Sequence, residues 1–191
     1  ALDGKLSLDI PLGGTAAPLV VVDFAAKDAQ LSIPEPGLEL SGITAAFRYN
    51  SASGLSTPAL RARAFNQPVS GKIVAEGARG RTRTRIEATS KIALADLTKW
   101  LDVAEVKLPV SGTLPYKLNV IFDENNSQLQ VDSSLRGLAV DLPAPFGKRA
   151  DEVRNSSFSM PLTARVPTYR ANYAGMASLA LAMPDGKPDS L

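Results

Sequence analysis

The chain has 191 residues, of which 45% are hydrophobic and 21% charged, and a net charge of +2. This composition is typical of a folded domain and excludes wholesale disorder and a membrane-embedded chain. The net charge is too small for the molecule as a whole to attract polyanions. Histidine and cysteine are both absent, which removes the commonest general base, the commonest transition-metal ligand, thiolate chemistry and disulfides, so we expect no enzyme, no metal site and no cofactor.

The first predicted strand covers residues 5–10, where apolar and polar side chains alternate until Pro11 and a glycine pair end the pattern. The same alternation returns over residues 20–24 and, more briefly, over residues 31–33. Successive side chains of a strand point to opposite sides. Each of these strands is therefore predicted to be apolar on one face and polar on the other.

A longer strand is predicted over residues 38–49, and its alternation changes phase in the middle. Leu38 and Leu40 carry the apolar side before Gly42, whereas Ile43 and every second residue after it carry that side afterwards. An extra residue within a strand shifts the pleat in this way. The sequence therefore predicts a β-bulge or bend at Gly42-Ile43.

Two hairpins follow in the chain. Residues 60–64 and 69–75 alternate on either side of a turn that contains Pro68, and residues 110–122 alternate before a polar turn that leads into residues 129–135. Apolar residues recur at helical spacing only over residues 94–101, which we predict to form one short helix. Strand alternation returns from residue 158 to residue 181.

Strands that follow one another without intervening helices indicate antiparallel pairing, because parallel crossovers need a dozen or more residues. The predicted class is therefore all-β with one short helix, as a single segment over residues 1–183 with a loose tail over residues 184–191. The apolar face must be covered by a second sheet, by the same sheet curled round, or by a ligand. The periodicity does not choose among these three.

Membrane insertion and targeting have no signal in this chain. Its most apolar run, Ala16–Val22, is interrupted by Pro18 and falls well short of the ~20 residues of a spanning helix. The N-terminus begins directly in a strand pattern, without a basic region followed by an apolar one. We interpret the chain as part of a longer protein.

The strongest charge feature is an arginine ladder, which alternation places on one face of a strand. Its members are Arg79, Arg81, Arg83 and Arg85. The favoured interpretation is a solvated strand face, because nucleic-acid-binding sheets interleave basic residues with exposed aromatics and this strand has threonine instead. A third interpretation makes the four arginines candidate contacts for lipid phosphates. We expect no binding of nucleic acid.

Catalytic and nucleotide-binding motifs are missing from the sequence. The carboxylates are scattered without an acid–base pairing, the GxSxG motif is absent, and the GKRADE stretch lacks the spacing of a phosphate-binding loop. We therefore predict no catalytic residue.

Several stretches, in the order found here, resemble the YhdP family within the AsmA-like superfamily of Gram-negative envelope proteins. The most specific is GLAVDLPAPFGK at Gly137–Lys148, followed by SFSMPL at residues 157–162. The supporting stretches are DIPLGG (9–14), IPEPGLELSGITAAFRY (33–49), RARAFNQPVSGKI (61–73), ADLTKWL (95–101) and LPVSGTLPYKL (108–118).

The resemblance implies a large, twisted antiparallel sheet curled into an open apolar groove. It also implies a periplasmic part of an inner-membrane-anchored protein that moves phospholipid between the inner and outer membranes. Phospholipid, neighbouring segments of the same long chain and other envelope proteins are the implied partners. The family offers no catalytic residues to carry over.

Acyl-chain contact is assigned to the aliphatic and aromatic rows of the predicted strands. The assigned residues are Leu6, Leu8, Ile10, Val20, Val22, Phe24, Leu40, Phe47, Ile73, Leu114, Leu118, Val120, Phe122, Leu129, Val131 and Leu135. The alternative is a structural or adhesive β-sandwich, in which the same rows face each other as a dry core.

Overall fold

A computed structural model describes seven stretches of the chain. They are residues 1–9, 18–34, 37–78, 81–102, 109–123, 126–164 and 166–182. The expectations for Ile10, for Arg79, for the side chain of Arg81 and for the tail over residues 184–191 lie outside the described residues.

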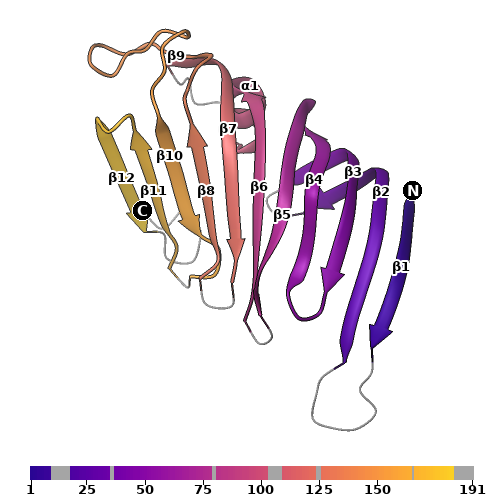
Figure 1. Ribbon diagram of the computed structural model, residues 1–191. Helices are drawn as coiled ribbons and strands as arrows, with labels where there is room; N and C mark the ends of the chain where they lie inside the picture. Colours follow the sequence, from indigo (N-terminus) through magenta and orange to yellow (C-terminus); the bar gives the residue numbers. More distant parts are fainter. Residues whose placement is uncertain are drawn as a thin grey trace. The chain divides into compact units, whose positions relative to one another are not determined.

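Twelve strands and one helix make up the described structure (Figure 1). In chain order they are β1 (Leu2–Asp9), β2 (Leu19–Ile33), β3 (Leu38–Asn50), β4 (Gly54–Ala64), β5 (Gln67–Ala78), β6 (Arg81–Ala93), α1 (Leu94–Trp100), β7 (Val110–Phe122), β8 (Gln128–Ser133), β9 (Leu138–Val140), β10 (Ser156–Pro161), β11 (Thr168–Tyr173) and β12 (Ala177–Ala182). The predicted all-β class with one short helix is confirmed.

The described strands belong to one antiparallel sheet. Hydrogen bonding follows the order β1-β2-β3-β4-β5-β6-β7-β8-β10-β11-β12, and β9 pairs with β7 outside that path. Because β1 and β12 stand at the two ends of the order, the sheet is not closed into a barrel. A β-sandwich divides its strands between two hydrogen-bonded sheets, so this pairing favours the large antiparallel sheet over the sandwich alternative.

Contacts within the chain group it into two compact units. The first comprises Ala1–Ala88 with Val120–Ser127, and the second comprises the described residues of Thr89–Asn119 and Gln128–Leu191. The expectation of a single segment over residues 1–183 stays a prediction.

Strands β1 to β5 of the first unit form an antiparallel meander. Leu6 pairs with Val22, and Val22 pairs in turn with Tyr49. Directly opposed residues point to the same side of a sheet, so these three side chains share one face. The alternation in the sequence thus becomes one apolar and one polar face across the meander.

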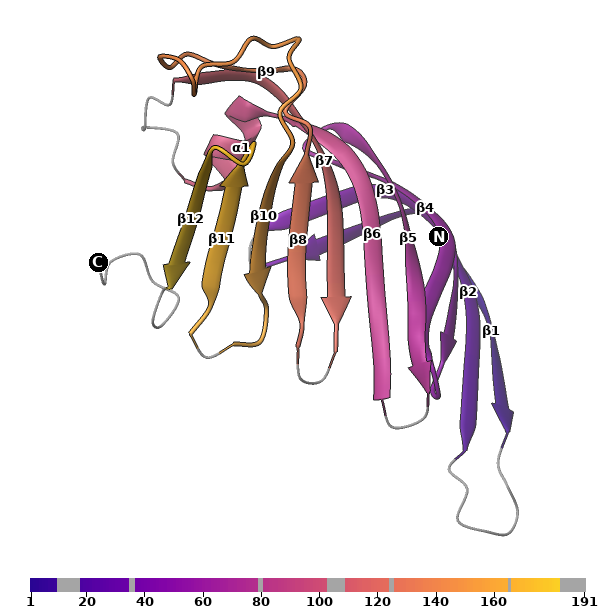
Figure 2. The same cartoon turned by 60° about the vertical axis from the view of Figure 1, so that its left-hand side comes forward.

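A bend interrupts β2 and β3 at matching places. Asp28 and Gly42 have φ angles of +50° and +61°, and the register shifts on both sides of Ala29, which pairs with Ile43. Glycine adopts a positive φ angle without steric cost. Figure 2 shows the two strands changing direction in this region, which confirms the bend predicted at Gly42-Ile43.

The packed core of the first unit lies beside this bend. Ala26, Ile43 and Ala62 are buried, and Leu40 and Phe47 are among the partly buried side chains packed against them. Two of the three buried residues are alanines, so the buried part of this core is small.

The second unit contains a regular ladder over β8, β10, β11 and β12. Val131 pairs with Phe158, Phe158 with Ala171, and Ala171 with Leu179. Helix α1 also belongs to this unit and ends one residue earlier than predicted, because Leu101 already has a ψ angle of 0°.

Candidate functional site

The apolar face of the first unit is the larger candidate surface. Cross-strand pairing joins Leu8 to Val20, Leu6 to Val22, and Phe24 to Phe47 on this face. The rings of the last pair stack with centroids 4.9 Å apart. The face is continuous from β1 to β3, so it offers a run of aliphatic and aromatic groups rather than isolated apolar side chains.

Exposure changes sharply across this face. At the β1 edge Leu6 is 67% exposed, whereas Ala26 near the bend is 4% exposed. Burial by neighbouring protein therefore seals the middle of the face and leaves its β1 side open. Contiguous exposed apolar surface commonly marks a binding surface.

The second unit carries a matching apolar row. Phe158 and Tyr169 lie with ring centroids 6.3 Å apart, and Leu179 on the edge strand β12 is among the exposed large apolar side chains. Like the first face, this row is most accessible at its edge strand.

The residues assigned to acyl-chain contact fall into three groups by exposure. Leu6, Leu8 and Phe122 are exposed, while Val120 and Leu135 are buried. The remaining described ones are half-buried, namely Val20, Val22, Phe24, Leu40, Phe47, Ile73, Leu114, Leu118, Leu129 and Val131.

Leu135 departs most clearly from the row to which alternation assigned it. Strand β8 ends at Ser133, whose hydroxyl accepts a hydrogen bond from the Leu135 N–H at 2.9 Å. Leu135 then adopts a φ angle of +52°. Because the strand has ended, alternation no longer determines where its side chain points.

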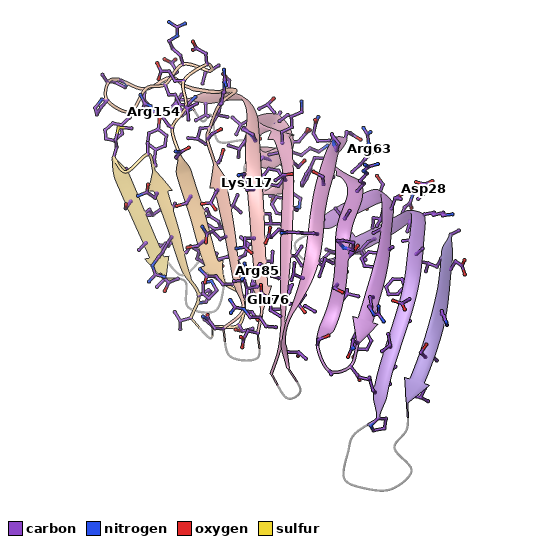
Figure 3. All side chains as sticks on the ribbon, in the orientation of Figure 1. Asp28, Arg63, Glu76, Arg85, Lys117 and Arg154 are labelled. Carbon is purple, nitrogen blue, oxygen red and sulfur yellow. The ribbon has the colours of Figure 1, made fainter. Side chains whose placement is uncertain are left out.

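The polar face of the first unit is covered by ion pairs. Arg85 lies 2.9 Å and Arg83 3.6 Å from Glu76 carboxylate oxygens, and Lys72 lies 3.1 Å from Glu87. Figure 3 labels Arg85 and Glu76 at neighbouring positions. The side chains of Arg83 and Arg85 are therefore already engaged by a carboxylate and are half-buried, whereas the favoured interpretation was a solvated strand face.

Sequence reasoning missed how the loop between β8 and β10 is held by Arg154 (Figure 3). The guanidinium donates hydrogen bonds to the carbonyl oxygens of Pro145 (2.9 Å), Phe146 (3.3 Å) and Gly147 (2.7 Å). It also donates to the Tyr173 hydroxyl at 3.1 Å, and this hydroxyl donates to the Phe146 carbonyl at 2.7 Å. One arginine thus fixes three consecutive carbonyls to β11.

Lys148 provides a second anchor for the same loop. Its side chain is buried, and Nζ donates to the carbonyl oxygens of Leu138 at 2.6 Å and Arg149 at 2.8 Å. Desolvation lowers the pKa of this ammonium, and nearby Glu152 partly opposes the effect. In the sequence, Lys148 belongs to the polar GKRADE stretch, and nothing in that stretch indicates that the lysine is buried.

Comparison with known families now adds to this geometry. The family model described as YhdP protein matches residues 1–186. The chain belongs to the YhdP family. No curated protein and no solved structure gives a significant match. The resemblance seen in the sequence is confirmed.

Two further observations bear on this YhdP-family chain. No helix in its described part is long and apolar enough to span a membrane. The described residues also contain no group of three or more acidic side chains able to hold a metal ion. Among the described residues, the candidate functional surfaces are the two apolar faces and the loop held by Arg154.

Proposed function

We propose that the chain is a lipid-transfer segment of the Gram-negative envelope, whose apolar strand faces shield phospholipid acyl chains in an open groove between the inner and outer membranes. It would act in the periplasm, as part of an inner-membrane-anchored protein, with neighbouring segments and other envelope proteins as partners. Membership of the YhdP family supports this proposal. The observation that carries it is the open side of the first unit's apolar face, where Leu6 and Leu8 are exposed beside Val22.

The energetics of such a face suit a passing acyl chain. Burial of one methylene group contributes about 0.8 kcal/mol, so a chain of roughly sixteen carbons gains on the order of 10 kcal/mol when it is hidden from water. Strands lie about 4.8 Å apart, so an acyl chain about 20 Å long that crosses them touches roughly four. Many similar weak contacts hold the lipid without fixing it at one position, and no chemical step is needed.

The first experiment asks whether lipid accompanies the protein. The chain is purified from a Gram-negative host, extracted with organic solvent, and the extract is examined by mass spectrometry. We expect phospholipid in stoichiometric amount. A clean protein that also fails to take up phospholipid from micelles would contradict the proposal, and elevated absorbance at ~260 nm would favour nucleic acid instead.

A matched pair of variants then tests the assigned face. Leu6→Asp places a charge on the apolar side of β1, and Ser7→Asp places the same charge on the other side of the same strand. Both positions are exposed, so both variants should keep the strand content of the parent chain. We expect lipid occupancy to fall several-fold in Leu6→Asp alone, because a carboxylate is costly beside an acyl chain.

Phe122→Asp is the corresponding test on β7, where the side chain is also exposed. Equal occupancy in Leu6→Asp, Ser7→Asp and Phe122→Asp, with intact folding in all three, would remove the assignment of these residues to lipid contact.

A further inference from the structure

The tip of the loop between β8 and β10 is apolar and exposed. It runs over residues 142–147 as LPAPFG and contains no charged side chain. Leu142 is 45% and Phe146 42% exposed. The adjacent Lys148 turns its ammonium inward to the Leu138 carbonyl, so the nearest exposed charges are those of Asp141 before the tip and Arg149 after it.

The backbone of this tip is largely satisfied from within. Pro143 and Pro145 have no N–H group, and the N–H groups of Phe146 and Gly147 both donate to the Pro143 carbonyl, at 3.0 and 3.1 Å. Arg154 and the Tyr173 hydroxyl occupy the carbonyls that follow. The tip therefore combines exposed hydrocarbon with a backbone that is bonded from within except at Leu142 and Ala144.

This combination distinguishes between two kinds of partner. A protein surface can offer its own donors and acceptors, so it gains nothing from a backbone that is already satisfied. Hydrocarbon offers none, and each unsatisfied backbone group placed in it costs several kcal/mol. A loop that holds its backbone bonds inside and its apolar side chains outside fits a lipid surface.

We propose that the tip over residues 142–147 is a membrane-contact element that enters the interfacial region of a lipid bilayer. Val153 and Met176 are also exposed, and they line a shallow hollow of about 740 Å³ together with Ala144 and Pro145, with Arg154 and Asn155 as its polar lining. They widen the contact. Leu142 and Ala144 make no backbone hydrogen bond within the described residues, which limits entry to a depth that water still reaches. Arg154 is the positioning residue.

The sequence allows a direct measurement of this contact, because it contains no cysteine. Ala144→Cys in the full chain is labelled with a polarity-sensitive fluorophore and mixed with vesicles of phosphatidylethanolamine and phosphatidylglycerol. We expect a blue shift and quenching by lipids brominated on their acyl chains. Val166→Cys is the control. Val166 is 48% exposed and lies between the last residue of β10 and the first residue of β11, whereas the loop with the tip precedes the first residue of β10. The control should show neither effect. An unshifted, unquenched probe at Ala144, or equal quenching at both positions, would overturn the proposal.

Variants of the unlabelled chain give the second readout, which is flotation with the same vesicles. Phe146→Asp should weaken binding about tenfold, since loss of a large apolar contact together with an added charge exceeds one decade in the partition constant. Val166→Asp should leave binding unchanged, and raised salt should change binding little, because residues 142–147 themselves carry no charge. Unchanged binding in Phe146→Asp, or equal loss in the two variants, would overturn the proposal.

Arg154→Lys separates the positioning role from the apolar contact. Lysine keeps the charge but cannot fork between consecutive carbonyls, so we expect weaker flotation with the strand signal retained. If Phe146→Asp or Arg154→Lys does not fold, the labelled Ala144→Cys chain decides the question. Lipid extraction is scored separately, so a chain that carries phospholipid yet ignores vesicles contradicts only the membrane contact.

Discussion

The apolar face of the first unit and the loop held by Arg154 in the second unit expose similar side chains for different physical reasons. Leu6 stands in water because β1 is an edge strand, and only strand pairing holds it there. Phe146 stands in water because Arg154 and Tyr173 bond its carbonyl and those of its neighbours. The first surface follows from alternation, whereas the second requires a few particular polar groups. A single substitution on the face should therefore have a modest effect on stability, whereas a single substitution of a bonding residue in the loop should have a large one.

The largest effect is expected for Arg154→Ala. The side chain is 20% exposed, and its loss leaves the carbonyls of Pro145 and Gly147 without their donor, while the Phe146 carbonyl keeps only its bond from the Tyr173 hydroxyl. We expect a loss of about 3 kcal/mol in the free energy of unfolding, measured by urea denaturation.

Arg149→Ala is the matched control in the same loop, because Arg149 is 80% exposed and its side chain pairs with Asp151. It should change stability by less than about 0.5 kcal/mol. Similar losses in the two variants would show that the loop is not fixed by particular polar groups.

The packed part of the first face gives the next largest effect. Ala45 is buried, and its neighbour Ala46 points to the other face and is exposed. Ala45→Leu should destabilise the chain by about 1–3 kcal/mol through overpacking, while Ala46→Leu should be nearly neutral. Thermal unfolding followed by circular dichroism measures both. If leucine is tolerated at position 45, the middle of the face is open rather than sealed.

A smaller effect is expected on the polar side of the first unit. Glu76→Gln removes the carboxylate that pairs with Arg83 and Arg85. These side chains are partly solvated, so the loss should be about 0.5–1 kcal/mol and should shrink at high salt. Asp23→Asn breaks the more exposed pair with Arg48 and should cost less. A salt-independent loss of several kcal/mol would mean that charges anchor the face as they anchor the loop.

The smallest effect concerns the pH dependence that Lys148 contributes. Burial lowers its folded-state pKa below the ordinary value of 10.5, so between the two values the unfolded chain binds more protons than the folded one. Stability from this group must then rise with pH across that window. The difference in unfolding free energy between the parent chain and Lys148→Met should move in favour of the parent as the pH approaches 10.5. A constant difference, or one of opposite slope, would contradict the inferred burial.

Sequence reasoning predicted the strands because each needs only a local pattern. The bend at Gly42, the two hairpins and the sharing of one face by Leu6 and Val22 all follow from a period of two and from turn residues. The exposure of side chains was harder to predict. Val120 and Leu135 are buried, and alternation along a strand does not show which other parts of the chain cover a side chain.

The loop could not be predicted for a different reason. Arg154 meets carbonyls seven to nine residues earlier in the chain, and Tyr173 lies nineteen residues later. No periodicity encodes such bonds. The proline-rich stretch at residues 142–147 entered the sequence analysis only through the family resemblance, and nothing in its composition indicated that a buried lysine and one arginine would hold it by hydrogen bonds.

The order of strands has consequences for how such a chain folds during synthesis and for how its sheet can be lengthened. Apart from β9, each strand from β1 to β12 bonds to the strand beside it in the sequence. A newly synthesised chain can therefore assemble hairpin by hairpin as it emerges, without waiting for distant partners. For the same reason, duplicating or deleting two adjacent strands preserves every other pairing and the alternation of faces, so evolution or an engineer can alter the length of the sheet in steps of one hairpin.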